Sequence, residues 1–175
     1  DWKGLGLAVQ AYQKRAPQVI DWLIGLAEAL DTSFMVRPVK GAYWDTEIKR
    51  AQERGLDGFP VFSKKAATDL CYLDCAKKML DARPRLFPQF ATHNALSLAA
   101  ILELAGDKEG YEFQRLHGMG EELYNLEMEI EGVPARIYAP VGGYKDLLAY
   151  LVRRLLENSA NSSFVAKVAD EKIPV

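Results

Sequence analysis

The sequence contains few of the residues that metal centres and disulfide frameworks require. Only 2 cysteines and 2 histidines occur among its 175 residues. Cys71 and Cys75 are about one helical turn apart, so they share a face and lack the second ligand pair of a zinc site. We expect them to be buried or half-buried reduced thiols. His93 and His117 follow different predicted strands without converging carboxylates, which argues against a histidine metal site.

Long apolar runs and clustered positive charge are also missing. No stretch approaches the ~18 uninterrupted apolar residues of a membrane-spanning helix, and the first residues lack a basic and then apolar secretion signal. The net charge is -2, with both signs interspersed, which argues against direct DNA binding because a nucleic-acid surface concentrates positive charge. With 49% hydrophobic residues, the chain is expected to form one globular unit. Without a spanning helix or a secretion signal, the cytoplasm is its expected location.

Strand-like and helix-like patterns alternate along the chain. Short apolar runs predict strands at residues 5–11, 34–39, 87–90, 111–116 and 135–139. Helices are predicted at residues 17–30, 63–80, 94–104, 121–128 and 144–158, and a charged helix is predicted at 45–54. Pro38 is expected at a strand end, where its missing N–H is tolerated. The alternation predicts a parallel α/β architecture.

Residues suited to binding follow four of the five predicted strands. These runs are rich in glycine, aromatic and hydrogen-bonding residues and occupy positions 39–44, 91–94, 116–120 and 138–143. All lie at strand carboxyl ends, the edge on which (βα)8 TIM-type barrels build active sites. The first strand is not followed by the Gly-x-Gly-x-x-Gly pattern of a Rossmann site, and no Gly-Lys-Ser/Thr phosphate loop is present. A nucleotide would therefore be held by barrel loops and arginines.

Two adjacent arginines, Arg153 and Arg154, lie in the last predicted helix. A guanidinium group can hold a carboxylate or phosphate through two parallel hydrogen bonds, and a pair of them can fix a small anion in one orientation. The alternative is a solvated helix face on which Arg153 pairs with Glu157, an interaction worth only a few tenths of a kcal/mol. The segment alone does not decide between these interpretations.

Four segments together resemble the proline dehydrogenase family, nearest to the proline dehydrogenase domain of the bifunctional bacterial proline-utilisation flavoenzymes. They are RPVKGAYWD at 37–45, PQFATHN at 88–94, YEFQRLHGMG at 111–120 and YLVRRLLEN at 150–158. The resemblance covers essentially the whole chain in order. It implies a (βα)8 barrel with FAD at the strand carboxyl ends, oxidation of L-proline to pyrroline-5-carboxylate, and transfer of the electrons to a membrane quinone. A different barrel enzyme, such as a flavin-dependent reductase or a lyase, is the weaker alternative.

The resemblance also implies roles for individual residues. Arg153 and Arg154 match the pair that holds the proline carboxylate. Tyr138, Tyr43 and Leu116 match residues that line the substrate pocket, where a flat aromatic ring can pack on a pyrrolidine. Flavin contacts match Gln10, Arg37, Val39, Lys40, Gly41, Trp44, Thr92, His93, Asn94, Gln114, Glu157 and Ser163. Among these, Arg37 is expected at the pyrophosphate, and Gly41 is expected to allow close approach of the backbone to the cofactor.

The length of the chain departs from the family pattern. A (βα)8 barrel typically needs ~250 residues, and only about the last five βα units match here, so residues 1–175 are expected to be the carboxyl-terminal part of the barrel domain. The family's substrate-facing lysine and aspartate from earlier strands have no counterpart. Two interpretations follow: a piece of a functional flavoenzyme completed by the missing amino-terminal strands, or a catalytically incomplete fragment that retains flavin or anion binding. A fused aldehyde dehydrogenase domain and a peripheral position at the inner face of the cytoplasmic membrane belong to the first.

Overall fold

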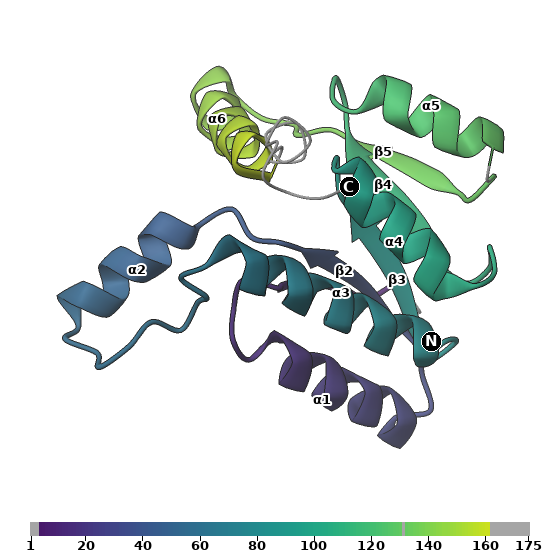
Figure 1. Ribbon diagram of the computed structural model, residues 1–175, viewed down its shortest axis with the longest axis horizontal. Helices are drawn as coiled ribbons and strands as arrows, with labels where there is room; N and C mark the ends of the chain where they lie inside the picture. Colours follow the sequence, from purple (N-terminus) through teal and green to yellow (C-terminus); the bar gives the residue numbers. More distant parts are fainter. Residues whose placement is uncertain (1–3, 131, 162–175) are drawn as a thin grey trace, which may run out of the picture.

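The computed structural model describes residues 4–130 and 132–161, and it contains every predicted element in the predicted order (Figure 1). The ends differ from the predicted ones by no more than three residues. The elements are β1 (Gly6–Gln10), α1 (Ala16–Ala29), β2 (Phe34–Val39), α2 (Trp44–Glu53), α3 (Lys65–Asp81), β3 (Leu86–Ala91), α4 (Ala95–Ala105), β4 (Glu112–Leu116), α5 (Glu121–Ile130), β5 (Ala135–Tyr138) and α6 (Tyr144–Asn161).

The five strands form one parallel sheet in the order β1-β2-β3-β4-β5. Each strand therefore pairs with the strands before and after it along the chain, and the order never reverses. A doubly wound sheet would contain such a reversal, whereas a TIM-type barrel adds each strand beside the last. The strand order confirms the predicted α/β class and its TIM-type arrangement.

In the part of the chain that the structure describes, α1, α3, α4 and α5 cover one face of the sheet (Figure 1). Side chains of α1, α3, α4 and α5, including Ile20, Tyr72 and Ile101, share one hydrophobic core with the outward-facing strand residues. On β2, buried Phe34, Val36 and Pro38 alternate with half-buried Met35, Arg37 and Val39. This period of two places one set under the helices and leaves the other set on the opposite, inner face. The inner face carries polar residues of the central strands, among them Gln89, Glu112 and Gln114.

Aromatic residues dominate the core beneath α4 and α5. The rings of Phe90, Tyr111, Phe113 and Tyr124 lie 5.9 to 6.3 Å apart, mostly edge to face. All four are at most 1% exposed. Aromatic pairs in such geometries contribute about 0.5–1.5 kcal/mol each beyond the burial of their area. This cluster holds β3 and β4 in register beneath the two helices.

Two prolines occur where strand pairing changes. The pairing of β2 with β3 ends at Val36, which lies opposite Pro88, and Pro38 follows beyond it. On the other side of β3, pairing with β4 begins only at Gln89. Pro38, next to last in β2, thus lies near a strand end as predicted, and its missing N–H interrupts no bond to β3.

Cys71 and Cys75 are buried on α3 and form no disulfide, as predicted from their spacing. Burial raises the pKa of both thiols, that of Cys75 to about 12. Because the thiolate is the reactive form of cysteine, both residues act as small core side chains at neutral pH.

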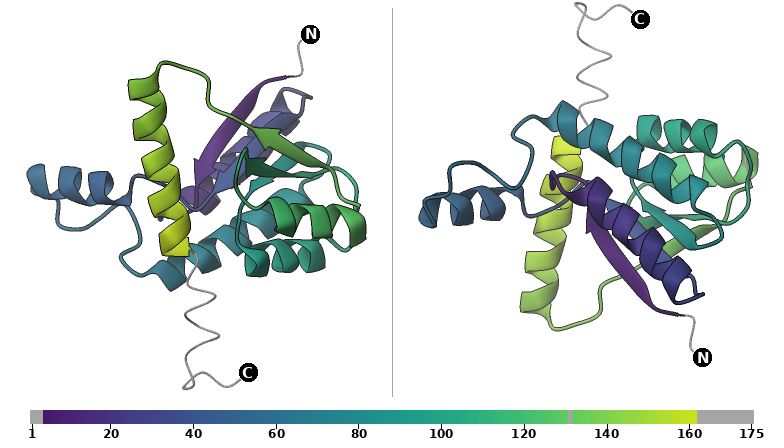
Figure 2. Two further views of the ribbon diagram at one scale, coloured as in Figure 1. Left: turned by 90° about the horizontal axis from the view of Figure 1, so that it is seen from above. Right: turned by 90° about the horizontal axis from the view of Figure 1, so that it is seen from below.

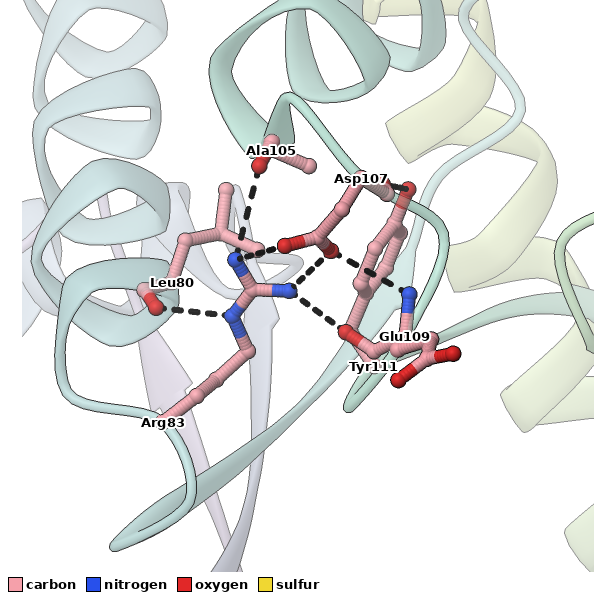
Figure 3. A network of polar contacts seen from close by, with 6 residues as sticks. All are labelled: Leu80, Arg83, Ala105, Asp107, Glu109 and Tyr111. Carbon is pink, nitrogen blue, oxygen red and sulfur yellow. Dashed lines mark hydrogen bonds and ion pairs between the residues drawn. The ribbon is translucent and has the colours of Figure 1, made fainter.

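At the amino-terminal end of the strands, Arg83 connects the loop after α3 to the loop after α4 (Figure 3). Its Nε donates to the carbonyl of Leu80 at 2.8 Å, and its Nη1 donates to Asp107 Oδ1 at 2.6 Å and to the carbonyl of Glu109 at 2.5 Å. The Tyr111 hydroxyl donates to the carbonyl of Asp107 at 3.1 Å. The bond to Leu80 satisfies a backbone carbonyl that the end of α3 leaves open, and the others tie the two loops together.

The last helix lies at the opposite, carboxyl-terminal end of the strands. Figure 2 shows α6 there, beside the loop between β2 and α2, whereas α1, α3, α4 and α5 lie along the sheet. Within the described residues, β1 and β5 pair on one side only. Leu7 and Ile137 on these outer strands are 38% and 54% exposed. No described helix is both long and apolar enough to span a membrane.

Candidate functional site at the carboxyl ends of the strands

A pocket of about 430 Å³ opens between the loop after β2, the start of α3 and α6. Residues from these regions and from the loop after β1 line it, among them Tyr12, Gly41, Tyr43, Trp44, Phe62 and Arg153. The indole Nε1 of Trp44 donates to the carbonyl of Phe62 at 2.8 Å, which fixes the ring at the wall. The structure thus brings Lys40, Gly41, Tyr43 and Trp44 to one pocket with Arg153, a residue far away in sequence.

The arginine pair faces Tyr43. The guanidinium carbons of Arg153 and Arg154 lie 5.5 and 5.9 Å from the centre of its ring, and Arg154 lies 5.1 Å from the ring of Tyr150. Cations within about 6 Å of an aromatic ring are attracted by its face. The Nε of Arg153 is buried and has no hydrogen-bond partner among the described residues. Two cationic groups with donors therefore meet beside an aromatic wall, which suits a small carboxylate.

A second arginine–tyrosine contact crosses the inner face of the sheet. The guanidinium carbon of Arg37 on β2 lies 4.5 Å from the ring centre of Tyr138 on β5. The Nε of Arg37 is also buried without a hydrogen-bond partner among the described residues. Because a buried donor left unpaired costs free energy, this atom indicates a place where an additional acceptor would be stabilised.

The segment after β3 is shaped by local hydrogen bonds. Asn94 caps α4, since its Oδ1 accepts from the backbone N–H of Ser97 at 2.9 Å. Thr92 Oγ1 accepts from the N–H of Asn94 at 3.2 Å. His93 Nε2 accepts from the N–H of Leu116 at 2.9 Å, so this nitrogen carries no proton and the ring joins the ends of β3 and β4.

Tyr124 on α5 strengthens the same junction. Its hydroxyl lies 2.6 Å from the carbonyl of Thr92 and 3.1 Å from that of Gln114. Thr92, His93 and Asn94, which are predicted to contact the flavin, therefore also help to build the edge of the sheet. Their sequence pattern predicted a ligand, but their capping and strand-joining roles appear only in the fold.

Lys40 and Gly41 have structural partners that the sequence did not indicate. Lys40 Nζ lies 2.6 Å from Asp69 Oδ1, and its side chain is only 10% exposed. A Cβ at Gly41 would lie 2.5 Å from the Tyr12 ring, and φ there is +124°. Gly41 was expected to admit a cofactor; in the structure the group that approaches its backbone is Tyr12. An alanine at this position would collide with that ring.

Lys65 also binds Asp69, at 2.8 Å from Oδ2. Burial by itself raises the pKa of Asp69, but hydrogen bonds and charge attraction from Lys40 and Lys65 outweigh it and lower the pKa below its ordinary value. Asp69 therefore remains ionised near neutral pH. It balances the charge of Lys40 at the wall of the pocket.

A polar cluster on the inner face was not identified from the sequence. Glu112 is 5% exposed. It accepts from Gln89 Nε2 and Gln114 Nε2 at 2.8 Å each and from Arg136 Nε and Nη2 at 2.9 Å each. Strand register explains the arrangement, because Gln89 lies opposite Glu112 and Gln114 lies opposite Arg136. The signal was the alternation of aromatic and polar residues in YEFQ at 111–114, which predicts one polar strand face.

Three of the remaining predicted site residues lie at the carboxyl ends of strands. Gln10 and Val39 are register partners at the ends of β1 and β2, and Leu116 is buried at the end of β4. The side chain of Glu157 and the whole of Ser163 lie outside the described part of the chain. Apart from these two, the predicted substrate and flavin residues occupy one end of the sheet or its inner face.

Comparison with known proteins agrees with this geometry. The family model for proline dehydrogenase matches residues 1–167. The chain is 56% identical to the bifunctional protein PutA of Escherichia coli, an alignment that covers 99% of this chain and 14% of that protein. It is 31% identical to proline dehydrogenase 1 of Bacillus subtilis over 95% of this chain and 49% of that protein. The chain thus spans a minor part of these relatives.

Solved structures show the same arrangement of elements. Crystal structures of proline utilization A from Bradyrhizobium japonicum superpose with a TM-score of 0.87 at 66% identity, over 99% of this chain and 18% of that one. Proline utilization A from Bdellovibrio bacteriovorus, inactivated by N-propargylglycine, gives a TM-score of 0.88 at 41% identity, with the same coverage of 99% and 18%. Sequence and fold together show that the chain belongs to the proline dehydrogenase family.

Proposed function

We propose that this chain contributes the substrate clamp and much of the flavin site of an FAD-dependent proline dehydrogenase, which oxidises L-proline to pyrroline-5-carboxylate. The observation that carries the proposal is the meeting of Arg153 and Arg154 over Tyr43 at the pocket. The buried Nε of Arg153 has no partner among the described residues. A carboxylate bound there would supply the acceptor that is missing.

The described residues fit a flavin at the same end of the sheet. Arg37 offers a buried donor beside Tyr138, and a delocalised cation suits the pyrophosphate or an acceptor atom of the ring. Gln10, Val39, Gln114 and the segment after β3 lie at the same end of the sheet or on its inner face. Bound FAD supplies the two-electron oxidation; the protein's part is to orient proline through its carboxylate and to pack its ring against Tyr43, Tyr138 and Leu116.

The proposal includes features that rest on the family resemblance alone. These are electron transfer to a membrane quinone, a cytoplasmic location with peripheral association at the inner face of the membrane, and a fused aldehyde dehydrogenase domain in the longer protein. It also includes three further βα units, since a TIM-type barrel closes with eight strands and five occur in the described residues.

The alternative is a fragment that binds flavin or an anion without turnover. The one-sided pairing of β1 and β5 favours it for the 175 residues in isolation. The deciding experiment uses a protein that contains this chain together with the remaining barrel strands. It should bind about one FAD per chain, and L-proline should bleach the visible band of the oxidised flavin. Stoichiometric flavin that L-proline does not bleach would contradict the proposed oxidation, and absence of flavin would contradict the cofactor.

A further inference from the structure

Glu112 receives all its hydrogen bonds from three neighbouring strands. Its two carboxylate oxygens accept from Gln89 on β3, from Gln114 on its own strand and from Arg136 on β5. The four distances lie between 2.8 and 2.9 Å. Such complete pairing is the condition under which a buried charge is tolerated. These hydrogen bonds therefore hold the carboxylate in one position on the inner face of the sheet.

An ionised carboxylate constrains the amides beside it, because it can only accept hydrogen bonds. The side-chain amide of Gln114 must turn its NH2 group toward Glu112. Its carbonyl oxygen then points away from Glu112, and this oxygen has no hydrogen-bond partner among the described residues. A neutral side chain at position 112 could donate as well as accept, and the amide of Gln114 could then adopt either orientation. The charge of Glu112 thus decides which group Gln114 presents.

Gln114 lies two residues closer than Glu112 to the carboxyl end of β4, the end at which flavin binding is proposed. The polar edge of an oxidised flavin ring carries acceptors at N1, O2, O4 and N5 and a single N–H donor at N3. A carbonyl oxygen can pair only with the donor. We propose that Glu112 is a positioning residue that makes Gln114 present its carbonyl oxygen to the flavin N3–H; this rests on the proposed FAD site.

The inference is tested by binding, with flavin-free protein that contains this chain and the remaining barrel strands. FAD and its 3-methyl analogue, which lacks the N3–H, are titrated and their dissociation constants compared. The native protein should prefer FAD by about tenfold or more, the effect of losing one hydrogen bond whose partner then stays unpaired. Glu112→Gln should reduce this preference severalfold while FAD still binds.

Two further variants keep the test decisive. Gln114→Met removes the carbonyl acceptor but leaves Glu112 and Arg136 paired, so it should abolish the preference even if Glu112→Gln fails to fold. Gln89→Met removes a different donor to Glu112 and leaves the bond to Gln114, so the preference should persist.

Equal binding of FAD and the analogue by the native protein, or an undiminished preference in Gln114→Met, would overturn the inference. An equal loss of the preference for FAD in Gln89→Met would also overturn the inference, because it would show that any disturbance around Glu112 has this effect. Failure of the native protein to bind FAD would instead contradict the proposed cofactor site.

Discussion

Arg37 and Tyr138 touch, with 4.5 Å between the guanidinium carbon and the ring centre, although β3 and β4 separate their strands. In a flat sheet, strands three positions apart would be roughly 14 Å apart. Long side chains span part of that distance, and a sheet that curves around its inner face, as the wall of a barrel does, shortens the rest. The curvature brings side chains of β2 and β5 to one place, where the proposed flavin and substrate would meet.

The arginine pair provides the most direct test of substrate binding. Arg153→Met or Arg154→Met, in a protein with the complete barrel, should lower kcat/KM for L-proline. The loss of transition-state stabilisation should be roughly 2 to 4 kcal/mol, the cost of truncating one partner of a desolvated charge pair. FAD content should stay near that of the native protein. Steady-state kinetics and flavin-to-protein ratios measure both. Arg85→Met, at an exposed ion pair with Asp31, is the matched control; unchanged proline kinetics in both site variants would contradict the clamp.

Arg37 is predicted to bind FAD, so that its loss should release the cofactor from the protein. Arg37→Ala removes a buried guanidinium donor on the inner face, while the core beneath the helices stays intact because Val36 and Pro38 point to the other side. We expect flavin depletion after gel filtration with an unchanged far-ultraviolet circular dichroism spectrum. Tyr138→Phe keeps the aromatic ring next to Arg37 and should retain FAD. Full flavin occupancy in Arg37→Ala would remove this residue from the cofactor site.

The sequence predicted the elements well because most strands are short runs rich in apolar residues, and glycine, proline and polar residues separate them from the helical segments. Asn94 shows the limit: its position predicted a ligand-bearing loop, and its Oδ1 is occupied by capping α4. Lys40 was predicted as a flavin contact, but the sequence could not reveal Asp69 as its partner, because that ion pair joins β2 to α3 through the tertiary fold. The same holds for Glu112 and Arg136, which strand register places together.

Arg83 is expected to affect stability without affecting the site. Its side chain connects two loops at the amino-terminal end of the strands, the end that in barrel proteins serves stability. Arg83→Met should destabilise the fold by about 2 kcal/mol, because the carbonyls of Leu80 and Glu109 lose a charged donor. Thermal unfolding should show a lower midpoint. At temperatures well below that midpoint, kcat/KM and FAD content should match those of the native protein; loss of flavin there would assign Arg83 a role at the site.

Glu112 gives a predicted pH dependence of stability. Burial alone raises its pKa, but hydrogen bonds from Arg136, Gln114 and Gln89 outweigh this and lower the pKa below its ordinary value of 4.5. The ionised form therefore stabilises the fold fully above pH 4.5, and the contribution is lost as the pH falls through the lower pKa of the folded state. Glu112→Gln should be less stable than the native protein near neutral pH, and the difference in unfolding midpoint should shrink on acidification. A difference that is constant across this range would contradict an ionised Glu112.

The final prediction concerns the 175 residues expressed alone. β1 and β5 each have an unpaired edge within the described residues, and Leu7 and Ile137 are exposed there. Unpaired parallel edges promote association with other chains. We expect an aggregated or oligomeric product without proline:quinone activity. Adding the remaining barrel strands as a separate chain should restore solubility and a flavin that L-proline bleaches, because both edges then find partners. Size-exclusion chromatography with light scattering and flavin spectra measure these outcomes; a soluble monomer that oxidises proline unaided would show that five strands suffice.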